Sequence, residues 1–255
     1  MSKIAVTGAG GRVGEYVLPA LDEHHNVVPV NRSEVDNWET TIADVTDYDA
    51  LVDALQGFDC VVHMAAQSAS EASWEDVTEP NIQGTWNLYR AAVENDVDRV
   101  VFASSNHVSH MPNMADSADP RSQKSPRESV PVSADDLPRP SGPYGITKVT
   151  GEAIGSYHAD RYGVDVVNVR IGWVLSEDDL RAKQETDLAD YARAMWLSPG
   201  DCQDGMRKAV MEPLPENPLT VNLLSENEER YLSLTKTMRT LDYRPEGDSG
   251  DVLNA

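Results

Sequence analysis

Tyr144 and Lys148, two residues with acid–base chemistry, stand four positions apart in this chain of 255 residues. At that spacing on a helix, their side chains share a face. A free tyrosine has a pKa of ~10 and is a poor base at neutral pH. An ammonium group ~4 Å away favours the phenolate by ~4 kcal/mol at an effective dielectric constant of ~20, which would bring the pKa of the phenol to ~7. The pair therefore predicts a general acid–base couple for proton transfer.

A glycine-rich turn near the N-terminus has the spacing of a phosphate-binding loop. Gly8, Gly11 and Gly14 lie between the apolar run 4–7 and a helical pattern that starts at Arg12. We expect Gly8 to permit the tight turn, Gly11 to let the backbone approach a pyrophosphate, and Gly14 to let the helix pack on the strand. The free N–H groups at the start of the helix favour phosphate. The turn therefore predicts a dinucleotide site, with a tight turn that binds no ligand as the alternative.

Asn31, Arg32 and Ser33 follow the second predicted strand and bear on the choice of dinucleotide. An acid at the end of this strand binds the ribose 2′-hydroxyl of NAD, whereas an arginine accommodates the 2′-phosphate of NADP. No acid stands at the tip of this strand. The three residues predict NADP as the preferred cofactor and NAD as a second one. In the alternative, Arg32 stacks on the adenine or pairs with a surface acid.

Strand-like and helix-like segments alternate along the chain. Apolar runs that predict buried strands lie at 4–7, 27–30, 41–43, 61–64, 100–103, 164–171 and 219–223. Helical patterns lie at 12–24, after the capping residue Asp47, around 86–94 and at 144–162, and shorter helices are expected to start at Ser198 and Ser233. This alternation predicts an α/β fold, a doubly wound parallel sheet of the Rossmann type with helices on both faces.

The pattern divides the chain into an NAD(P)-binding core at 1–172 and a small C-terminal lobe at 173–255. The ~80 residues of the lobe cannot bury a core alone, so we expect them to pack on the sheet and to bind substrate. Residues 246–255 resemble a solvated tail. Segment 111–143 holds seven prolines and has no periodicity. A loop of this length inside a domain is usually functional or disordered, and we expect it to form a wall or lid over the site.

The chain is strongly acidic, with 21 basic and 43 acidic residues and a formal net charge of −22. Such a field repels nucleic acid and anionic membranes, so we expect neither as a partner. In molar salt the Debye length is ~3 Å and the self-repulsion disappears. The composition therefore predicts a halophilic source, with an ordinary acidic mesophilic protein as the alternative.

The sequence also predicts a cytoplasmic protein. No apolar run approaches the ~20 residues that span a bilayer, and the first residues lack the pattern of a signal peptide. Cys60 and Cys202 are the only cysteines, so no disulfide framework and no cysteine-rich metal site is expected.

Motifs along nearly the whole chain resemble the extended short-chain dehydrogenase/reductase family, the NAD-dependent epimerase/dehydratase superfamily. The matching residues are Thr7-Gly8-x-x-Gly11-x-x-Gly14, Asp44-Val45, His63-Met64-Ala65-Ala66, Asn81-x-x-Gly84-Thr85, Ser104-Ser105 and Tyr144-x-x-x-Lys148. The resemblance implies that Tyr144 is the catalytic acid–base, that Lys148 lowers its pKa and holds the nicotinamide ribose, and that Ser105 hydrogen-bonds the reacting oxygen.

The resemblance also implies that Asp44 and Val45 contact the adenine and that Ala65 and Ala66 line the cofactor. A turn residue is the alternative role for Asp44, and His63 is expected to be a packed core histidine. The expected cofactor contacts are Gly8, Gly11, Arg12, Val13, Gly14, Asn31, Arg32, Ser33, Asp44, Val45, Ala65, Ala66, Tyr144, Lys148 and Ile171.

Segments 101–107, 137–140, 168–172 and 194–198 look like those of uronate dehydrogenases and of haloarchaeal sugar and glucose-6-phosphate dehydrogenases. These enzymes oxidise the anomeric carbon of a sugar to a lactone. The resemblance implies the same reaction on an aldose such as a pentose, a hexose or a sugar phosphate, with no metal. The expected substrate contacts are Arg12, Ser68, Ser105, Asn106, His107 and Trp173. A capped turn is the alternative role for Asn106 and His107.

Two departures from the uronate dehydrogenases weaken the assignment of a uronate substrate. Trp173 stands where those enzymes have a small hydroxyl residue, and neither Arg181 nor Arg193 aligns with their carboxylate-binding arginine. A neutral aldose or a sugar phosphate is therefore favoured, and Trp173 suits stacking on a sugar ring. The alternatives are a hexuronate dehydrogenase, a nucleotide-sugar 4-epimerase or dehydratase, and a non-enzymatic dinucleotide sensor. The family resemblance also suggests a homodimer or homotetramer through the helices that flank the site.

Overall fold

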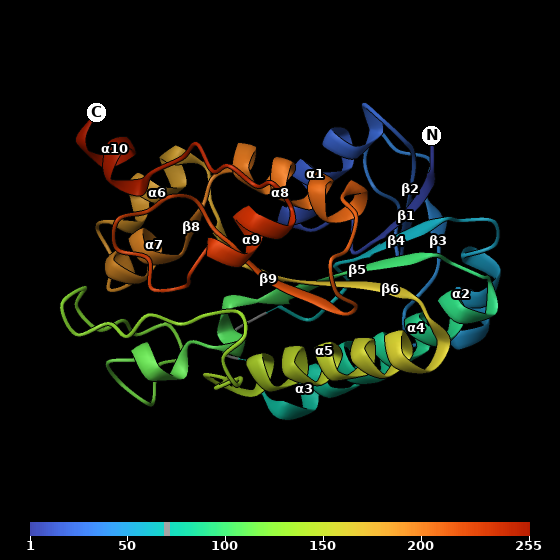
Figure 1. Ribbon diagram of the computed structural model, residues 1–255, viewed down its shortest axis with the longest axis horizontal. Coiled ribbons are helices and arrows are strands. Elements are labelled where there is room, and N and C mark those ends of the chain that lie inside the picture. Colours follow the sequence, from blue (N-terminus) through green and yellow to red (C-terminus); the bar gives the residue numbers. More distant parts are fainter. Residues whose placement is uncertain (69–71) are drawn as a thin grey trace.

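The computed structural model describes residues 1–68 and 72–255 and centres on a seven-stranded parallel sheet (Figure 1). The strand order is β3-β2-β1-β4-β5-β6-β9. β2 and β3 lie on one side of β1 and the later strands lie on the other, so the strand order reverses between β1 and β4. The strands are β1 (Lys3–Thr7), β2 (Asn26–Asn31), β3 (Thr41–Ile42), β4 (Cys60–His63), β5 (Arg99–Ser105), β6 (Asp165–Ile171) and β9 (Leu219–Leu223). The predicted doubly wound parallel sheet is confirmed.

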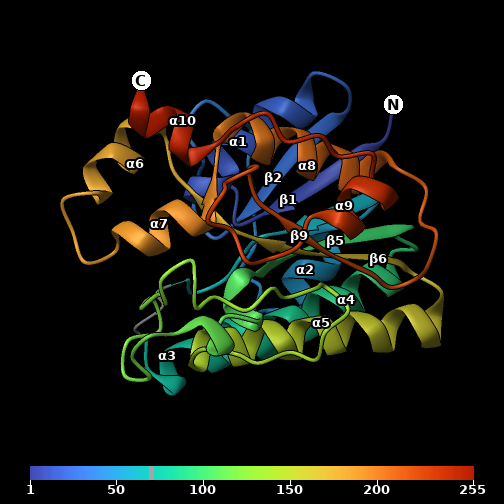
Figure 2. The same ribbon diagram turned by 60° about the vertical axis from the view of Figure 1, so that its left-hand side comes forward.

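Helices cover both faces of the sheet (Figures 1 and 2). On one face lie α1 (Arg12–Asp22), α8 (Pro199–Met211) and α9 (Thr235–Thr240). On the other lie α2 (Tyr48–Ala54), α4 (Gly84–Glu94) and α5 (Pro143–Tyr162), with α3 (Trp74–Thr78) and the π-helical turn η1 (Glu79–Gln83) just before α4. The Asp47 side chain accepts a hydrogen bond from Ala50 N, so the predicted cap of α2 is confirmed.

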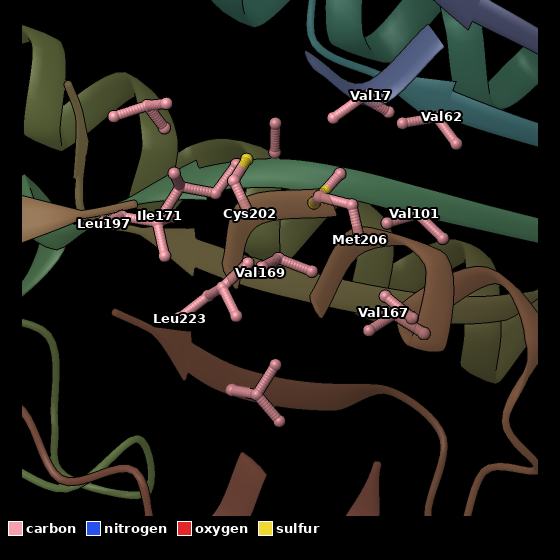
Figure 3. Packing of buried hydrophobic residues seen from close by; sticks show 14 of the residues in the cluster. Val17, Val62, Val101, Val167, Val169, Ile171, Leu197, Cys202, Met206 and Leu223 are labelled. Atoms are coloured by element: carbon pink, nitrogen blue, oxygen red, sulfur yellow. The ribbon is translucent and has the colours of Figure 1, made fainter. Parts of the chain in front are cut away.

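The larger part of the core lies between the sheet and the α1–α8 layer. Figure 3 shows Val101 and Val169 of neighbouring strands beside Cys202 and Met206 of α8. All four side chains are almost fully buried. Strands of a parallel sheet are covered on both faces, so apolar residues dominate them, which is why these strands were predictable.

The part of the chain after residue 172 contributes to this core as well as to a separate group of elements. β9 pairs with β6 over the whole length of β9 and so completes the central sheet. A second cluster gathers where α6 (Glu177–Lys183), α7 (Ala189–Met195), β7 (Trp173–Val174), β8 (Trp196–Leu197) and α10 (Ser249–Asn254) meet. The division at residue 172 into a cofactor part and a substrate part stays a prediction.

Two predictions about the C-terminal segment are wrong. Residues 246–255 are not a solvated tail, because Ser249 is buried and its backbone N–H donates to Asn227 Oδ1 at 3.1 Å. Ser233 is not the cap of α9, whose capping residue is Leu234. The N–H of Ser233 donates instead to Val132 O at 2.9 Å, which ties this stretch to segment 111–143.

Segment 111–143 is tied to its surroundings by backbone hydrogen bonds. Arg139 N donates to Val108 O, and Val132 N donates to Tyr231 O, at 2.9 and 2.8 Å. The segment begins with the short 3₁₀ turn η3 (Met111–Asn113). Among the residues that the structure describes, no helix is both long and apolar enough to cross a membrane.

Candidate active site

Five parallel strands, β1, β2, β4, β5 and β6, end at one cavity of about 870 Å³. Ligands of open α/β sheets bind at such carboxyl edges, where the strand order reverses. The lining described by the structure is Gly8, Gly10, Gly11, Arg12, Val13, Val30, Asn31, Arg32, Ser33, Glu34, Ala43, Asp44, Val45, Thr46, Met64, Ala65, Ala66, Gln67, Ser68, Asp76, Glu79, Pro80, Ala103, Ser104, Ser105, Tyr144, Lys148, Ile171 and Gly172. Most of the predicted site residues therefore surround one space.

The glycine-rich turn fits a dinucleotide phosphate group. Gly8 has a φ of +69°, and a Cβ atom there would lie 2.5 Å from Ala65 N, so only glycine allows this turn. A Cβ atom on Gly14 would lie 2.0 Å from Ala9 O, so glycine is needed where the helix approaches the backbone of the turn itself. Gly14 does not line the cavity, whereas Gly11 does. Gly11, Arg12 and Val13 at the start of α1 line this space, and the N–H groups of a first helical turn, which have no partner within the helix, are those that phosphates bind.

The residues predicted to contact the adenosine part lie at the β2 end of the cavity. Asn31 Nδ2 donates to Ser33 O at 2.9 Å and so fixes the turn that carries Arg32. Asp44 accepts hydrogen bonds from the backbone and side chain of Thr46 at 2.9 and 2.8 Å. These bonds, with a smaller contribution from the charge of Arg32, lower the pKa of Asp44. Asp44 is therefore both a turn residue and a lining residue.

Tyr144, Lys148 and Ser105 meet at the β5 end of the cavity. Pro143 at the first position of α5 starts the helix there, because its fixed φ suits that position. Lys148 Nζ is buried and donates to Ala103 O at 2.7 Å. It lies 5.7 Å from the centre of the Tyr144 ring. The predicted pair thus shares one face of α5, with the ammonium group directed at the end of β5.

The prediction of a Tyr144 pKa near 7 is wrong for this structure. Burial raises the pKa of Tyr144 to about 12, and a hydrogen bond with Ser105 only partly offsets this. Burial lowers the pKa of Lys148 to about 7, against the opposing charge of Glu152. Because both groups are desolvated, both charged forms are disfavoured. The phenol is therefore protonated at neutral pH, and its base form is a minor population.

Asn106 and His107 lie behind the lining, in the 3₁₀ turn η2 (Asn106–Val108). Asn106 Nδ2 donates to Tyr191 Oη, and His107 Nε2 lies 3.2 Å from the same hydroxyl. His107 N donates to Ser105 Oγ at 3.2 Å, the capped turn that was the alternative role. Among the residues that the structure describes, Asn106, His107 and the half-buried Trp173 do not line the cavity. Ser68, Arg12 and Ser105 do line it.

The two arginines considered for a substrate carboxylate are paired with acids of the chain itself. Arg193 Nε lies 3.0 Å from Glu229 Oε1, and Arg193 also pairs with Asp190. Arg181 lies 3.1 Å from Glu177 and 3.3 Å from Asp178. Neither arginine belongs to the described cavity lining.

Several lining residues were missed by the sequence analysis. Most of them adjoin a predicted residue along the chain and could have been found by extending each motif by one position. Pro80 is among these, because it precedes Asn81 of a quoted motif, but Asp76 and Glu79 are not, because they come from α3 and the start of η1, which were not predicted. No residue of segment 111–143 belongs to the described lining, so the predicted wall or lid lies beside the cavity rather than around it. Within 1–68 and 72–255, no group of three or more histidine, cysteine or acidic side chains could hold a metal ion.

Comparison with known proteins gives likenesses over the whole chain. The model of the NAD dependent epimerase/dehydratase family matches residues 4–199. L-arabinose 1-dehydrogenase (NAD(P)(+)) of Haloferax volcanii is 51% identical over 99% of this chain and 100% of that protein. The NAD-dependent glucose-6-phosphate dehydrogenase of the same organism is 32% identical over 97% and 94%. A mutated uronate dehydrogenase superimposes with a TM-score of 0.80 at 27% identity, over 98% of this chain and 83% of that one. The resemblance drawn from the motifs is confirmed.

Proposed function

The chain belongs to the NAD dependent epimerase/dehydratase family, and from this premise we propose that it oxidises the anomeric carbon of a neutral aldose to a lactone with NAD(P). The observation that carries the proposal is the meeting of Tyr144, Lys148 and Ser105 at one end of a cavity whose other end fits a dinucleotide. The 51% identity with an L-arabinose 1-dehydrogenase makes L-arabinose the first sugar to test.

Tyr144, in its minor phenolate form, is the group that takes the proton from the anomeric hydroxyl. Ser105, which hydrogen-bonds Tyr144, stabilises the reacting oxygen as the proton leaves. Lys148, held by Ala103 O, stabilises the phenolate when it carries its charge, and would hold the ribose of a bound nicotinamide. A bound NAD(P) would supply the acceptor for a hydride, which is one proton with two electrons from the anomeric carbon. The proton of the anomeric hydroxyl goes to Tyr144, so the sugar loses two protons and two electrons in all and becomes the lactone.

The charges around the cavity support a neutral sugar rather than a uronate or a sugar phosphate. Asp76 and Glu79 line the cavity together with Ser68, and both would repel an anionic substrate. Arg181 and Arg193 are neutralised by neighbouring acids, as described above. An anionic sugar would therefore meet the carboxylates of Asp76 and Glu79. Neither Arg181 nor Arg193 would be free to bind it.

NADP is proposed as the preferred cofactor and NAD as the second. Arg32 and Ser33 line the end of the cavity at β2, where an arginine and a hydroxyl suit a 2′-phosphate. Glu34 lines the same end, and its carboxylate suits the 2′-hydroxyl of NAD. This combination supports dual use, with the cation as the basis of the preference.

We also propose a homodimer through α4 and α5. Ile146, Ala153 and Tyr157 are exposed on α5, and the Trp86 ring of α4 lies 5.8 Å from that of Tyr157. These uncharged side chains offer a surface where two copies of a chain with a net charge of −22 can meet without repulsion. Light scattering should give twice the chain mass, and Tyr157→Glu should give the monomer.

The test of the proposed activity is a substrate screen in molar KCl. L-arabinose, other free aldoses, hexuronates and sugar phosphates are each offered with NADP and with NAD, and the reduced nicotinamide is followed. We expect turnover of L-arabinose or a related pentose, and a lactone as the product. Turnover of a hexuronate or sugar phosphate alone would overturn the neutral-aldose proposal, and turnover of no sugar would overturn the dehydrogenase itself.

A further inference from the structure

His63, at the end of β4, connects two threonines deep behind the cavity. Its Nδ1 lies 2.7 Å from Thr7 Oγ1, directly before the phosphate-binding turn, and its Nε2 lies 3.2 Å from Thr85 Oγ1 in α4. All three side chains are almost completely buried. The packed core histidine expected from the sequence is therefore also the centre of a hydrogen-bonded chain.

The direction of each hydrogen bond in this chain follows from its ends. Thr85 Oγ1 lies 2.6 Å from Asn81 O, a carbonyl that can only accept, so the Thr85 hydroxyl donates there. Thr85 must then accept from His63 Nε2–H, and in a neutral ring His63 Nδ1 is the acceptor for the Thr7 hydroxyl. Thr7 Oγ1 accepts in turn from Ala65 N–H at 3.3 Å. These bonds place a proton on Nε2, so that a neutral His63 takes the Nε2–H form.

Burial agrees with the neutral form of His63. It lowers the pKa of His63 to about 3, and the positive charge of Lys148 adds to the effect. The ring also lies 5.8 Å from that of Phe102, on the neighbouring strand.

From Asn81 the series of hydrogen bonds continues to α5, the helix that carries Tyr144 and Lys148. Asn81 lies in η1, and π-helical turns of this kind often mark functional sites. Its side chain donates to Thr147 Oγ1 at 3.0 Å, and Thr147 Oγ1 donates to Tyr144 O at 2.8 Å. The same side chain accepts from Gln67 N at 2.7 Å and donates to Gln67 O at 3.1 Å. The phosphate turn, the cavity wall around Gln67 and the backbone of Tyr144 thus belong to one hydrogen-bonded network.

We propose that His63, Thr85 and Asn81 are positioning residues, which set the Tyr144 backbone relative to the wall that the cofactor and sugar contact. None of the three lies in the described lining of the cavity, so each acts through another residue. The kinetic part of this proposal depends on the dehydrogenase function proposed above. Its structural part, that His63 is neutral and in the Nε2–H form, does not depend on that function.

The kinetic test breaks the chain at Thr85 with a side chain of the same shape. Thr85→Val should lower kcat by ~10- to 100-fold, the scale of small misplacements at a reacting centre, and leave KM for the sugar within ~2-fold. Thr85→Ser keeps the hydroxyl and should restore kcat to within ~3-fold of the natural protein. Thr237→Val is the matched control, because Thr237 is also buried and donates to a backbone carbonyl, Asn222 O, far along the chain.

A merely structural role of Thr85 predicts a different pattern. Thr85→Val and Thr237→Val would then lower the melting temperature by similar amounts and have similar kcat values. That outcome would overturn the proposal. A loss of kcat in Thr85→Val that Thr85→Ser does not restore would overturn it too. The melting temperatures of all variants, measured in molar KCl, show whether each variant is folded when its kcat is compared with that of the natural protein.

The second readout needs no substrate. In protein with ¹⁵N-labelled histidine, the resonances of the six histidines are assigned with single His→Gln variants. We expect His63 to be neutral and in the Nε2–H form throughout about pH 5 to 8, and to lose that form in Thr85→Val but not in Thr237→Val. A charged His63, or the Nδ1–H form in the natural protein, overturns the proposal. Turnover of no sugar by the natural protein overturns the dehydrogenase function and leaves this result standing.

Discussion

Glu152 and Arg170 form a buried bidentate ion pair behind the cavity, with Nε–Oε1 and Nη2–Oε2 distances of 2.9 and 2.8 Å. Glu152 also accepts from Ser104 Oγ at 2.6 Å, and Arg170 donates to Ala134 O at 3.2 Å. Glu152 lies one helical turn after Lys148, and its charge opposes the lowering of the Lys148 pKa by burial. The pair thus ties α5, β5, β6 and segment 111–143 together.

Removing one partner of this pair should be costly. Glu152→Gln leaves the Arg170 charge unpaired in the interior, which typically costs about 3–5 kcal/mol of unfolding free energy. Urea unfolding in molar KCl measures the loss. Glu177→Gln is the control, because its pair with Arg181 is exposed and should contribute less than about 1 kcal/mol. Equal losses in the two variants would contradict the importance of burial here.

Tyr144→Phe should abolish turnover while cofactor binding survives. The substitution removes the phenolic oxygen that accepts the proton, and general acid–base groups contribute about 10²- to 10⁴-fold to rates. Initial rates with L-arabinose and fluorescence titration with NADPH measure the two properties separately. Tyr162→Phe removes the hydroxyl of an exposed tyrosine near the far end of α5 and should leave both unchanged. Near-normal activity of Tyr144→Phe would refute the mechanism.

Three buried histidines should make the fold sensitive to mild acid. Burial lowers the pKa of His63 and His107 to about 3 and that of His110 to about 4. Below the ordinary value of about 6.5, the unfolded chain binds protons that the folded chain does not, so stability is lost as the pH falls from there towards the folded values. The loss is up to about 1.4 kcal/mol per pH unit for each histidine.

Urea unfolding at a series of pH values measures this slope. His110→Gln should make the slope shallower, because one proton fewer is taken up on unfolding. His24→Gln should leave it unchanged, because His24 is exposed. A stability that is flat between neutral pH and about pH 5 would contradict the burial of these three rings.

Arg32→Ala should weaken the use of NADP selectively. A charge-assisted hydrogen bond to a phosphate contributes about 1.5–3 kcal/mol, so KM for NADP should rise about tenfold or more while KM for NAD changes little. Arg239→Ala removes an exposed arginine elsewhere and should change neither. A higher specificity constant for NAD than for NADP in the natural protein would contradict the proposed preference.

The melting temperature should rise as KCl increases towards about 1 M, where the Debye length is ~3 Å. The reason is the net charge of −22, whose self-repulsion salt screens. Neutralising the exposed acids Glu23, Asp36 and Asp160 as their amides should reduce the KCl needed. Calorimetry in a KCl series measures both effects, and a melting temperature that stays flat or falls with salt would contradict the halophilic assignment.

The sheet was predictable because its central strands are covered on both faces, so apolar residues dominate β1, β4 and the first half of β5. The long helix α5 and the turn at Gly8 were predictable because proline and glycine have backbone preferences of their own. The short helices α3 and α6 were missed, although Ser73 and Ser176 cap them and each has an acid three residues later. Attention to capping residues would have found both.

The electrostatics of the site could not be predicted from the sequence. The spacing of Tyr144 and Lys148 sets their common face, but not how deeply either is buried. Burial depends on the packing of β5, α5 and η2 together, and it raises the pKa of Tyr144 instead of lowering it. The same packing directs Asn106 towards Tyr191 instead of towards the cavity.

The place of β9 at the edge of the sheet has a consequence for biosynthesis. Of the strands described, β9 is the last to leave the ribosome, and until it does, the outer edge of β6 has no partner. An open strand edge invites pairing with other chains, and parallel sheets close slowly. Nascent chains that stall before Leu219 should therefore be the aggregation-prone species in expression, and co-expressed chaperones should act at that stage.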